Sequence, residues 1–297
     1  MDSYETLSKI GDGTFGTVYL CRKRVENQTK RPKPKQIKLV AVKKMKKRYF
    51  NWDECSRLRE VTALKRLNHR NIVSLKEVIR ESNNLYLVFD HMEENLYQLM
   101  RRQLVPFPES VIRKIVLQIV TGLAYIHKNG FFHRDIKPEN LLCQNGPELI
   151  KIADFGLTRE IDSKPPYTEY VSTRWYRAPE LLLHSTNYNW AVDIWAVGCI
   201  IGELYTNRPM FSGRSEIDQI FKICQILGPP NTANWPECER LASSIQLNFP
   251  NVVPMSLEQA ITDCSPVGVN LVKSMLQWSP KDRPKASEIA THCYFKK

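Results

Sequence analysis

Three glycines at positions 11, 13 and 16, within the stretch GDGTFGTV, have a spacing that lets a backbone approach phosphate groups. Glycine has no Cβ, so no side chain holds a ligand away from the main-chain amides. Strand-like sequence flanks the glycines on both sides, whereas a dinucleotide-binding fold would open a helix after the third glycine. Taken alone, the stretch is equally compatible with a hairpin turn that binds nothing.

The strand-like stretch VAVK at 40–43 places Lys43 downstream of the glycines. A lone lysine in a strand is usually a solvated edge residue, but Glu60 offers the opposite charge from the middle of the next predicted helix. That carboxylate could hold the ammonium group of Lys43 against the phosphates of ATP. The two residues therefore strengthen the prediction of phosphate binding.

The most specific stretch is HRDIKPEN at 133–140, followed by DFG at 154–156 and APE at 178–180. Five specified residues in the first stretch occur by chance in about one chain of this size in ten thousand. The order and spacing are those of the protein-kinase signature set. With the glycines and VAVK, the whole chain resembles a eukaryotic protein kinase. The resemblance implies an α+β fold of two lobes, a small antiparallel β-sheet lobe with one regulatory helix and a larger, mainly α-helical lobe.

The resemblance also implies roles in a reaction that uses ATP and Mg²⁺. Asp135 would accept or orient the proton of the substrate hydroxyl group. Asn140 and Asp154 would hold the Mg²⁺ that bridges the phosphates, and Lys43 with Glu60 would hold the phosphates themselves. Such a reaction depends on positioning and charge neutralisation more than on covalent catalysis.

Lys137 and Thr173 are the residues that, by resemblance, mark a serine/threonine kinase. Lys137 would also neutralise the transferred phosphoryl group. A pseudokinase scaffold that binds partners without catalysis is the alternative from another functional class. The complete set of motif residues argues against it.

The nucleotide is expected to lie between the two lobes. Adenine would be enclosed by apolar side chains from both lobes, and the backbone of the linking segment would bind its edge behind a bulky Phe89. The residues implied in nucleotide binding are Ile10, Gly11, Asp12, Gly13, Thr14, Phe15, Gly16, Val18, Ala41, Lys43, Asp90, Met92 and Leu142.

Two further motif residues are expected to be structural. The resemblance implies that Glu180 of APE pairs with Arg283 of KDRP, and that Asp193 of DIWAVGC braces the catalytic loop. Both are therefore predicted to position the site without touching the substrate.

The stretch TRWYRAPE and residues 211–231 resemble the group of cyclin-dependent, MAP, glycogen synthase and related kinases. Arg177 matches the arginine of that group and implies a preference for Ser or Thr followed by Pro. The triplet TEY at 168–170 alone would indicate a MAP kinase. Stretches without catalytic duty, such as NWDECSRLREV and NWPECERLASSIQLNFP, instead resemble the male germ cell-associated and ciliogenesis-associated kinases. RLREV in place of PSTAIRE argues against a cyclin partner.

The TEY triplet is predicted to be a phosphorylation switch set by an upstream activating kinase. A phosphate on Thr168 would add about −1.5 to −2 charges near neutral pH. By resemblance, Arg59, Arg134 and Arg159 would converge on it and order the loop. A phosphate on Tyr170 would instead meet the two arginines of TRWYRAPE.

Composition limits the other functions of the chain. The net charge of +12 arises within residues 22–48, which hold 13 Lys or Arg and one acidic residue, so no basic groove for nucleic acid is expected. The basic insert at about 24–37 is either a tolerated surface loop, a docking or targeting element, or a contact for an anionic membrane or nucleic acid. Eight scattered cysteines without a C-x-x-C pair predict no disulfide framework or zinc site.

No uncharged apolar run of 18 residues is present, so no membrane span is expected. The start lacks the apolar stretch of a signal peptide and the end lacks a prenylation box, which favours a cytoplasmic protein. We expect a monomer, and the resemblance implies presence in the cilium and the nucleus and a role in cilium length control.

Hydrophobic periodicity indicates the elements that position these motifs. Strand-like stretches fill the region before about residue 95, interrupted by an amphipathic helix over 54–67, and long helices are predicted over 107–130 and 190–208. The chain is therefore predicted to be one kinase domain, 1–297. Its expected parts are a first lobe at about 1–89, a hinge at about 90–95 and a second lobe at about 96–297.

Overall fold

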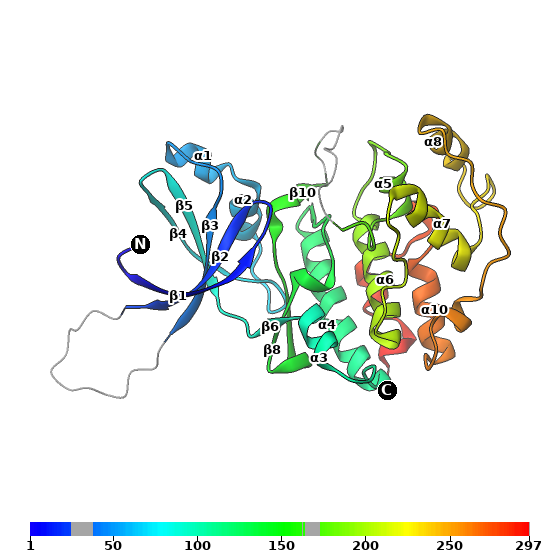
Figure 1. Ribbon diagram of the computed structural model, residues 1–297, viewed down its shortest axis with the longest axis horizontal. Coiled ribbons are helices and arrows are strands. Elements are labelled where there is room, and N and C mark those ends of the chain that lie inside the picture. The colour runs from blue at the N-terminus through cyan, green and yellow to red at the C-terminus, as the bar shows by residue number, and fades with distance from the viewer. Residues whose placement is uncertain (25–37, 162, 164–172, 297) are drawn as a thin grey trace.

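The structure is a computed structural model that describes residues 1–24, 38–161, 163 and 173–296. Figure 1 shows a small lobe of strands at one end of the molecule and a larger lobe of helices at the other. The segment after β5 joins the two lobes. The predicted α+β fold with two unequal lobes is confirmed.

The small lobe is a five-stranded antiparallel sheet with the strand order β1–β2–β3–β5–β4. Val40 and Val42 of β3 pack with Val88 of β5 in a small core on one face of the sheet. Because side chains alternate along a strand, Ala41 and Lys43 face the opposite side. The strands are β1 (Tyr4–Asp12), β2 (Gly16–Lys23), β3 (Leu39–Met45), β4 (Leu75–Glu81) and β5 (Asn84–Asp90).

The helix predicted over 54–67 is broken in two. The structure has α1 (Trp52–Ser56) and α2 (Arg59–Arg66), and Leu58 between them has an extended backbone with φ −62° and ψ 126°. The extended residue turns its side chain onto the main hydrophobic core. The hydroxyl group of Thr62 donates to the carbonyl of Ser56 at 3.1 Å, which satisfies an acceptor that the break exposes. The prediction of one continuous helix was therefore wrong.

The large lobe is mainly helical and carries two small antiparallel sheets, β6–β8–β9 and β7–β10. Its helices are α3 (Leu96–Arg102), α4 (Glu109–Lys128), α5 (Pro179–Leu182), α6 (Ala191–Thr206), α7 (Glu216–Leu227), α8 (Cys238–Ser244), α9 (Leu257–Ala260), α10 (Pro266–Met275) and α11 (Ala286–Ile289). Its strands are β6 (Glu94–Asn95), β7 (Phe131–Phe132), β8 (Leu141–Gln144), β9 (Leu149–Ile152) and β10 (Arg159–Glu160). Short 3₁₀ turns are η1 (Pro138–Asn140), η2 (Gly146–Glu148), η3 (Phe155–Leu157), η4 (Pro280–Asp282) and η5 (Cys293–Phe295).

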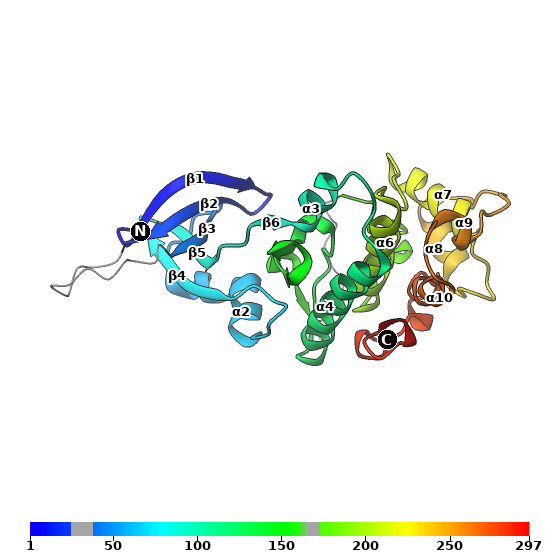
Figure 2. The ribbon, with the colours of Figure 1, turned by 90° about the horizontal axis from the view of Figure 1, so that it is seen from below.

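Two long helices, α4 and α6, form the centre of the large lobe (Figure 2). Every residue of α6 from Ala191 to Tyr205 is buried, as predicted for a helix that is apolar around most of its circumference. Within the described part of the chain, α4 is the single helix long and apolar enough to span a membrane. It packs against α6 and α11, which is the position of a core helix.

A buried ion pair between Glu180 and Arg283 joins α5, which begins within the APE motif, to the segment after α10. Both terminal nitrogens of Arg283 donate to the carboxylate of Glu180, at 2.7 and 2.8 Å. Arg283 also donates to the carbonyls of Gln277, Trp278 and Ala191. Its charge is thus fully satisfied although its side chain is inaccessible, as a buried ion requires. The predicted pairing of these two residues is confirmed.

A second buried carboxyl group lies near the end of α6. Glu203 is 4% exposed and accepts a hydrogen bond of 2.7 Å from the hydroxyl group of Tyr176. Burial raises the pKa of Glu203 to about 7, because the hydrogen bond from Tyr176 offsets only part of the lost hydration. The folded protein therefore holds a proton that the unfolded chain releases at lower pH.

The raised pKa of Glu203 predicts that stability falls as the pH rises from about 4.5 to about 7, since the folded state binds more protons in this range. The Glu203→Gln variant should lose this contribution, which amounts to at most about 3 kcal/mol. Thermal unfolding followed between about pH 5 and pH 8 measures the difference. Glu239→Gln, on the exposed surface of α8, is the matched control. A Glu203→Gln profile parallel to the wild-type profile would contradict the prediction.

Candidate active site

A buried lysine joins three elements that are distant in the sequence. Lys43 on β3 donates to both carboxylate oxygens of Glu60 on α2, at 2.9 and 2.8 Å, and to Oδ1 of Asp154 at 2.8 Å. Burial alone would lower the pKa of Lys43, but the charges of Glu60 and Asp154 outweigh burial and raise it. The ammonium group is therefore charged at neutral pH, as the binding of phosphate requires. The structure brings together these predicted residues from the two lobes.

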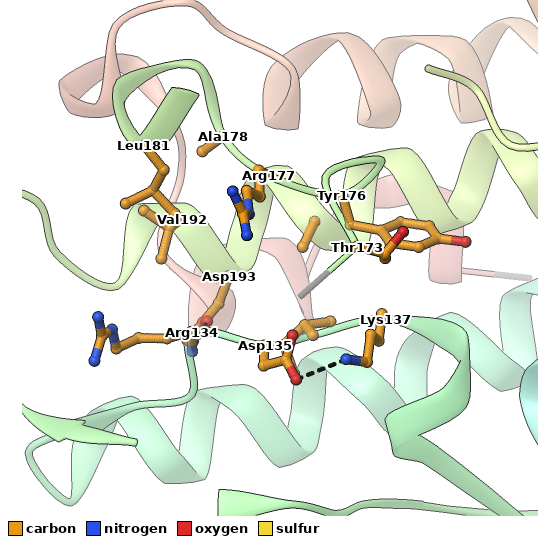
Figure 3. A pocket seen from close by; sticks show the side chains of 12 residues that line it. Arg134, Asp135, Lys137, Thr173, Tyr176, Arg177, Ala178, Leu181, Val192 and Asp193 are labelled. Carbon is orange, nitrogen blue, oxygen red and sulfur yellow. Dashed lines mark hydrogen bonds and ion pairs between the residues drawn. The ribbon is translucent and has the colours of Figure 1, made fainter. Parts of the chain in front are cut away.

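The catalytic loop brings two further predicted residues, Lys137 and Asn140, to the carboxylate of Asp135. Lys137 donates to Oδ2 of Asp135 at 2.8 Å, and Nδ2 of Asn140 donates to the same oxygen at 2.9 Å. Nδ2 of Asn140 also donates to the carbonyl of Asp135 at 2.8 Å. Figure 3 shows Asp135 and Lys137 facing Thr173 across a hollow. This arrangement places a hydrogen-bonded carboxylate and a cation where an acceptor hydroxyl could enter.

Asp193 of α6 supports the catalytic loop from beneath. Its carboxylate accepts from the backbone amides of His133 at 2.8 Å and Arg134 at 2.7 Å, and contacts Nε2 of His127 at 2.9 Å. Arg134 has a φ of +76°, a conformation that costs free energy in a residue with a Cβ. The two amide bonds to Asp193 hold the loop in this conformation. The predicted bracing role of Asp193 is confirmed.

Three arginines lie close together beside the catalytic loop. Burial and the charges of Arg159 and Arg134 lower the pKa of Arg59. Arg134 donates to the carbonyl of Leu157 at 3.1 Å and to the hydroxyl group of Tyr188. The three positive charges repel one another, and a bound anion would relieve this repulsion. The predicted phosphorylation sites Thr168 and Tyr170 themselves lie outside the described residues.

The glycine-rich turn shows which glycine the sheet requires and which ones leave space. A Cβ at Gly16 would lie 2.7 Å from the carbonyl oxygen of Lys44, so β2 and β3 could not approach as they do. A Cβ at Gly11 or Gly13 would meet nothing closer than 3.7 Å. Phe15 at the tip reaches Gly156 of the DFG motif, where an added Cβ would lie 3.0 Å from its ring. The turn therefore covers the loop that carries Asp154.

The donor set fits Mg²⁺ with phosphates. Because Nδ2 of Asn140 is used by Asp135, its Oδ1 is the atom left to bind a cation, and Asp154 supplies a carboxylate. Within the described residues, no group of three His, Cys, Asp or Glu side chains could hold a metal by itself. Mg²⁺ commonly takes one or two protein ligands and completes its shell with phosphates and water. Lys43 and the space above Gly11 and Gly13 would hold those phosphates.

The predicted adenine-binding residues lie on the facing elements of the two lobes. Ile10, Val18 and Ala41 belong to β1, β2 and β3, and Leu142 belongs to β8 of the large lobe. All four side chains are at least partly accessible, so they are available to a ligand. Asp90 ends β5, and Met92, together with Asp12 and Thr14 of the turn, is likewise partly or fully exposed. The roles of these residues in nucleotide binding stay predictions.

Arg177, four residues after Thr173, lines the same hollow as Asp135 (Figure 3). NH1 of Arg177 contacts Oε1 of Glu216 at 3.2 Å, and Oε2 of Glu216 contacts Nε2 of His184 at 2.8 Å. Neither Glu216 nor His184 is among the residues predicted from the sequence. Glu216 lies in the stretch that resembles the cyclin-dependent and MAP kinase group, which was the available signal.

Comparison with known proteins agrees with this geometry. The protein kinase domain family matches residues 4–295. The mouse (Mus musculus) proteins described as serine/threonine-protein kinase MAK and serine/threonine-protein kinase ICK are each 55% identical over 99% of this chain. A rice (Oryza sativa subsp. japonica) protein described as cyclin-dependent kinase F-4 is 48% identical over 99% of the chain.

The chain spans 46% and 45% of the length of the two mouse relatives and 62% of the rice relative. The predicted likeness to the male germ cell-associated subfamily is confirmed by the MAK relatives. The predicted enzyme class is also confirmed, because the protein kinase domain matches residues 4–295 and relatives that are 55% identical over 99% of the chain are described as serine/threonine-protein kinases. The chain therefore belongs to the protein kinase family, within its serine/threonine kinases.

Proposed function

We propose that the protein transfers the γ-phosphoryl group of ATP, with Mg²⁺, to Ser or Thr hydroxyl groups of protein substrates. The observation that supports this most strongly is the contact of Lys43 with both Glu60 and Asp154. It places the phosphate-binding lysine and a metal-binding carboxylate at one point. A scaffold without catalysis would not need that arrangement, since the buried charges are costly to bring together.

The residues around Asp135 divide the work of the transfer. Asp135 accepts or orients the hydroxyl proton as the acceptor oxygen bonds to phosphorus and the bond to ADP breaks. Lys137, already 2.8 Å from Asp135, neutralises the phosphoryl oxygens. Asn140 and Asp154 hold Mg²⁺, whose charge offsets that of the phosphates. Asp193 keeps the loop in place through its two amide bonds.

The second part of the proposal concerns substrate sequence and activation. Arg177, held by Glu216, supports a preference for Pro after the acceptor residue. The cluster of Arg59, Arg134 and Arg159 supports activation by a phosphate on the TEY loop, placed by an upstream kinase. A MAP-kinase-like signalling enzyme, favoured by the TEY triplet, is the second candidate.

Location and partners are proposed from the resemblance alone. The proposed places are the cytoplasm, the cilium and the nucleus, with a role in cilium assembly and length control. The protein is proposed to act as a monomer without a cyclin, although one relative is described as a cyclin-dependent kinase. Imaging of a fluorescent fusion in ciliated cells tests the location, and absence from cilia would contradict it.

Asp135→Asn should lower kcat by at least about 100-fold, because general-base catalysis and the orientation of the acceptor are lost. The control is Asp282→Asn, an exposed aspartate that does not line the hollow containing Asp135. Phosphate transfer from radiolabelled ATP to a generic basic substrate measures both, with a chelator for Mg²⁺ as a further control. Activity of Asp135→Asn within about threefold of the wild type would contradict the enzymatic proposal.

A peptide with Ser-Pro should have a kcat/KM at least about tenfold above that of the same peptide with Ser-Ala, a difference of about 1.4 kcal/mol. Glu216→Gln should reduce this ratio, because the guanidinium group of Arg177 loses a charged partner. Steady-state kinetics on the two peptides give the ratio. Equal kcat/KM values for the two peptides with the wild-type protein would rule out a preference for Pro after the acceptor residue.

Thr168→Ala should reduce the activity of protein activated by its upstream kinase by at least about tenfold, since no phosphate would then pair with the arginines. Arg59→Ala should have a similar effect, and the two changes together should cost no more than either alone. Thr291→Ala, on the exposed surface, is the control. Full activity in Thr168→Ala, or additive losses, would argue against the switch.

A further inference from the structure

Two neighbouring hollows on the large lobe form a trough away from the catalytic loop. One has a volume of about 370 Å³ and is lined by Pro106, Tyr205 at the end of α6 and Ile226 of α7, among others. The other has a volume of about 540 Å³ and is lined by α7 and the segment before α9. They share Met210 and Ile226, so they are continuous. We call the two together the α7 trough. In Figure 2, α7 and α9 lie at the outer end of the large lobe.

Large apolar side chains are exposed at both ends of the α7 trough. At one end, Leu104 and Val105, which directly precede Pro106 in the chain, are 101% and 68% exposed. At the other end, Val253 and Met255 in the trough wall are 95% and 50% exposed. Large apolar side chains that are exposed beside a hollow are more typical of an interaction site than of a plain solvated face.

The backbone beneath these side chains is fixed. The amide of Met255 donates to the carbonyl of Gln225 on α7 at 2.8 Å. The side-chain amide of Asn207 donates to the carbonyl of Gln103 at 3.4 Å. Leu104 with Val105, and Val253 with Met255, therefore lie on or beside segments that are held by hydrogen bonds. Binding of a partner would cost little conformational entropy at these segments.

The charges around the trough favour an acidic occupant. Arg208 lines the first hollow, Lys222 lines the second, and Arg214 lines a third hollow that shares Lys222 with the second. Among the described residues, no carboxylate lies within ion-pair distance of any of these three cations. Two acidic residues also line the hollows, Asp263 in the first and Asp218 in the third, where Asp218 accepts from the backbone amide of Arg214 at 2.7 Å. The three cations exceed these two acids by one positive charge.

The third hollow, which adjoins the α7 trough at Ser212 and Lys222, reaches the segment proposed to receive the substrate. The carbonyl of Gly213, between two residues of the third hollow, accepts a hydrogen bond of 3.3 Å from Nε1 of Trp175. The side chain of Gln219 on α7 donates to the carbonyl of Trp175 at 3.3 Å. Trp175 lies between Thr173 and Arg177, both of which line the catalytic hollow. A substrate segment bound in the trough could therefore continue along the protein surface to place its Ser or Thr near Asp135.

We propose that the α7 trough docks protein substrates through a segment that combines apolar and acidic residues and lies apart from the phosphorylated Ser or Thr. Val253, Met255 and Ile226 bind the apolar side chains, and Arg208 and Lys222 bind the carboxylates. The proposal rests on the proposed kinase function, because it assigns the occupant as a substrate. Docking raises the local concentration of the acceptor at Asp135 without changing the chemical step.

Direct binding tests the trough without reference to catalysis. The probes are two fluorescein-labelled peptides with three leucines and four glutamates each, one with helical and one with alternating spacing. Fluorescence anisotropy with the 297-residue chain should show saturable binding of one of them that weakens with salt. Val253→Asp with Met255→Asp should raise the Kd at least about tenfold, and Lys222→Glu at least about threefold, because an apolar contact and a charge are replaced. Val267→Asp, an exposed valine on α10, should leave the Kd unchanged.

A kinetic comparison tests whether the occupant is a substrate. A Ser-Pro acceptor peptide joined to the bound probe by a flexible linker should have a KM at least about tenfold below that of the acceptor alone, with the same kcat. The double variant should lose this gain and keep wild-type kinetics on the acceptor alone, since Val253 and Met255 are remote from the catalytic loop.

The outcomes separate the two proposals. Binding of a leucine-free glutamate peptide with equal affinity, or equal binding by the wild type and the double variant, would overturn the docking site. Failure of both probes to bind would overturn it as well. Specific probe binding with no phosphorylation of any acceptor would refute the kinase proposal while retaining the peptide site. Binding without a change in KM would refute the assignment of the occupant as a substrate.

Discussion

The buried ammonium group of Lys43 is the constraint on which the rest of the structure depends. Desolvation of a lysine costs several kcal/mol unless counter-charges and hydrogen bonds replace the lost water. Glu60 and Asp154 supply both, and they come from α2 and from the DFG segment of the other lobe. The positions of β3, α2 and the DFG segment relative to one another therefore depend on this one charged group. Because α2 starts only at Arg59, after the extended Leu58, its orientation toward Lys43 is set separately from that of α1.

Asp193 solves the corresponding problem in the large lobe. Catalysis requires an exposed loop with fixed side chains, yet exposed loops are ordinarily mobile. Asp193 is buried within α6 and binds two consecutive loop amides, so the rigidity of the core helix passes to Asp135. Burial alone would raise the pKa of Asp193, but His127, His133 and the loop amides lower it and keep the carboxylate ionised. A neutral acid would bind the amides more weakly and could not hold Arg134 at its positive φ.

The resemblance of the motifs to those of protein kinases predicted the fold, and the chemistry of a buried lysine predicted its pairing with Glu60. A buried lysine needs an acid, and Glu60 is the acid that helical spacing offers. The sequence shows no comparable sign of the break between α1 and α2. Leu58 fits the apolar spacing of a helix, and its side chain would pack toward the core whether its backbone is helical or extended. Glu216 and His184 are 32 positions apart in the sequence and meet through the packing of α7. No local pattern predicts a contact of that kind, which depends on how whole elements pack.

The distribution of charge explains why recognition by the large lobe has to be local. The net charge of +12 lies within residues 22–48, and the other residues carry 30 basic and 30 acidic side chains. A neutral remainder produces no long-range field, so an acidic partner is attracted only within about one Debye length of an unpaired cation, about 8 Å at physiological salt. In the proposed docking site, Arg208 and Lys222, which have no carboxylate within ion-pair distance among the described residues, would supply such cations beside exposed apolar side chains. Electrostatic attraction of acidic groups and burial of apolar side chains would then occur at the same surface. The affinity and the specificity of binding would therefore depend on the same residues.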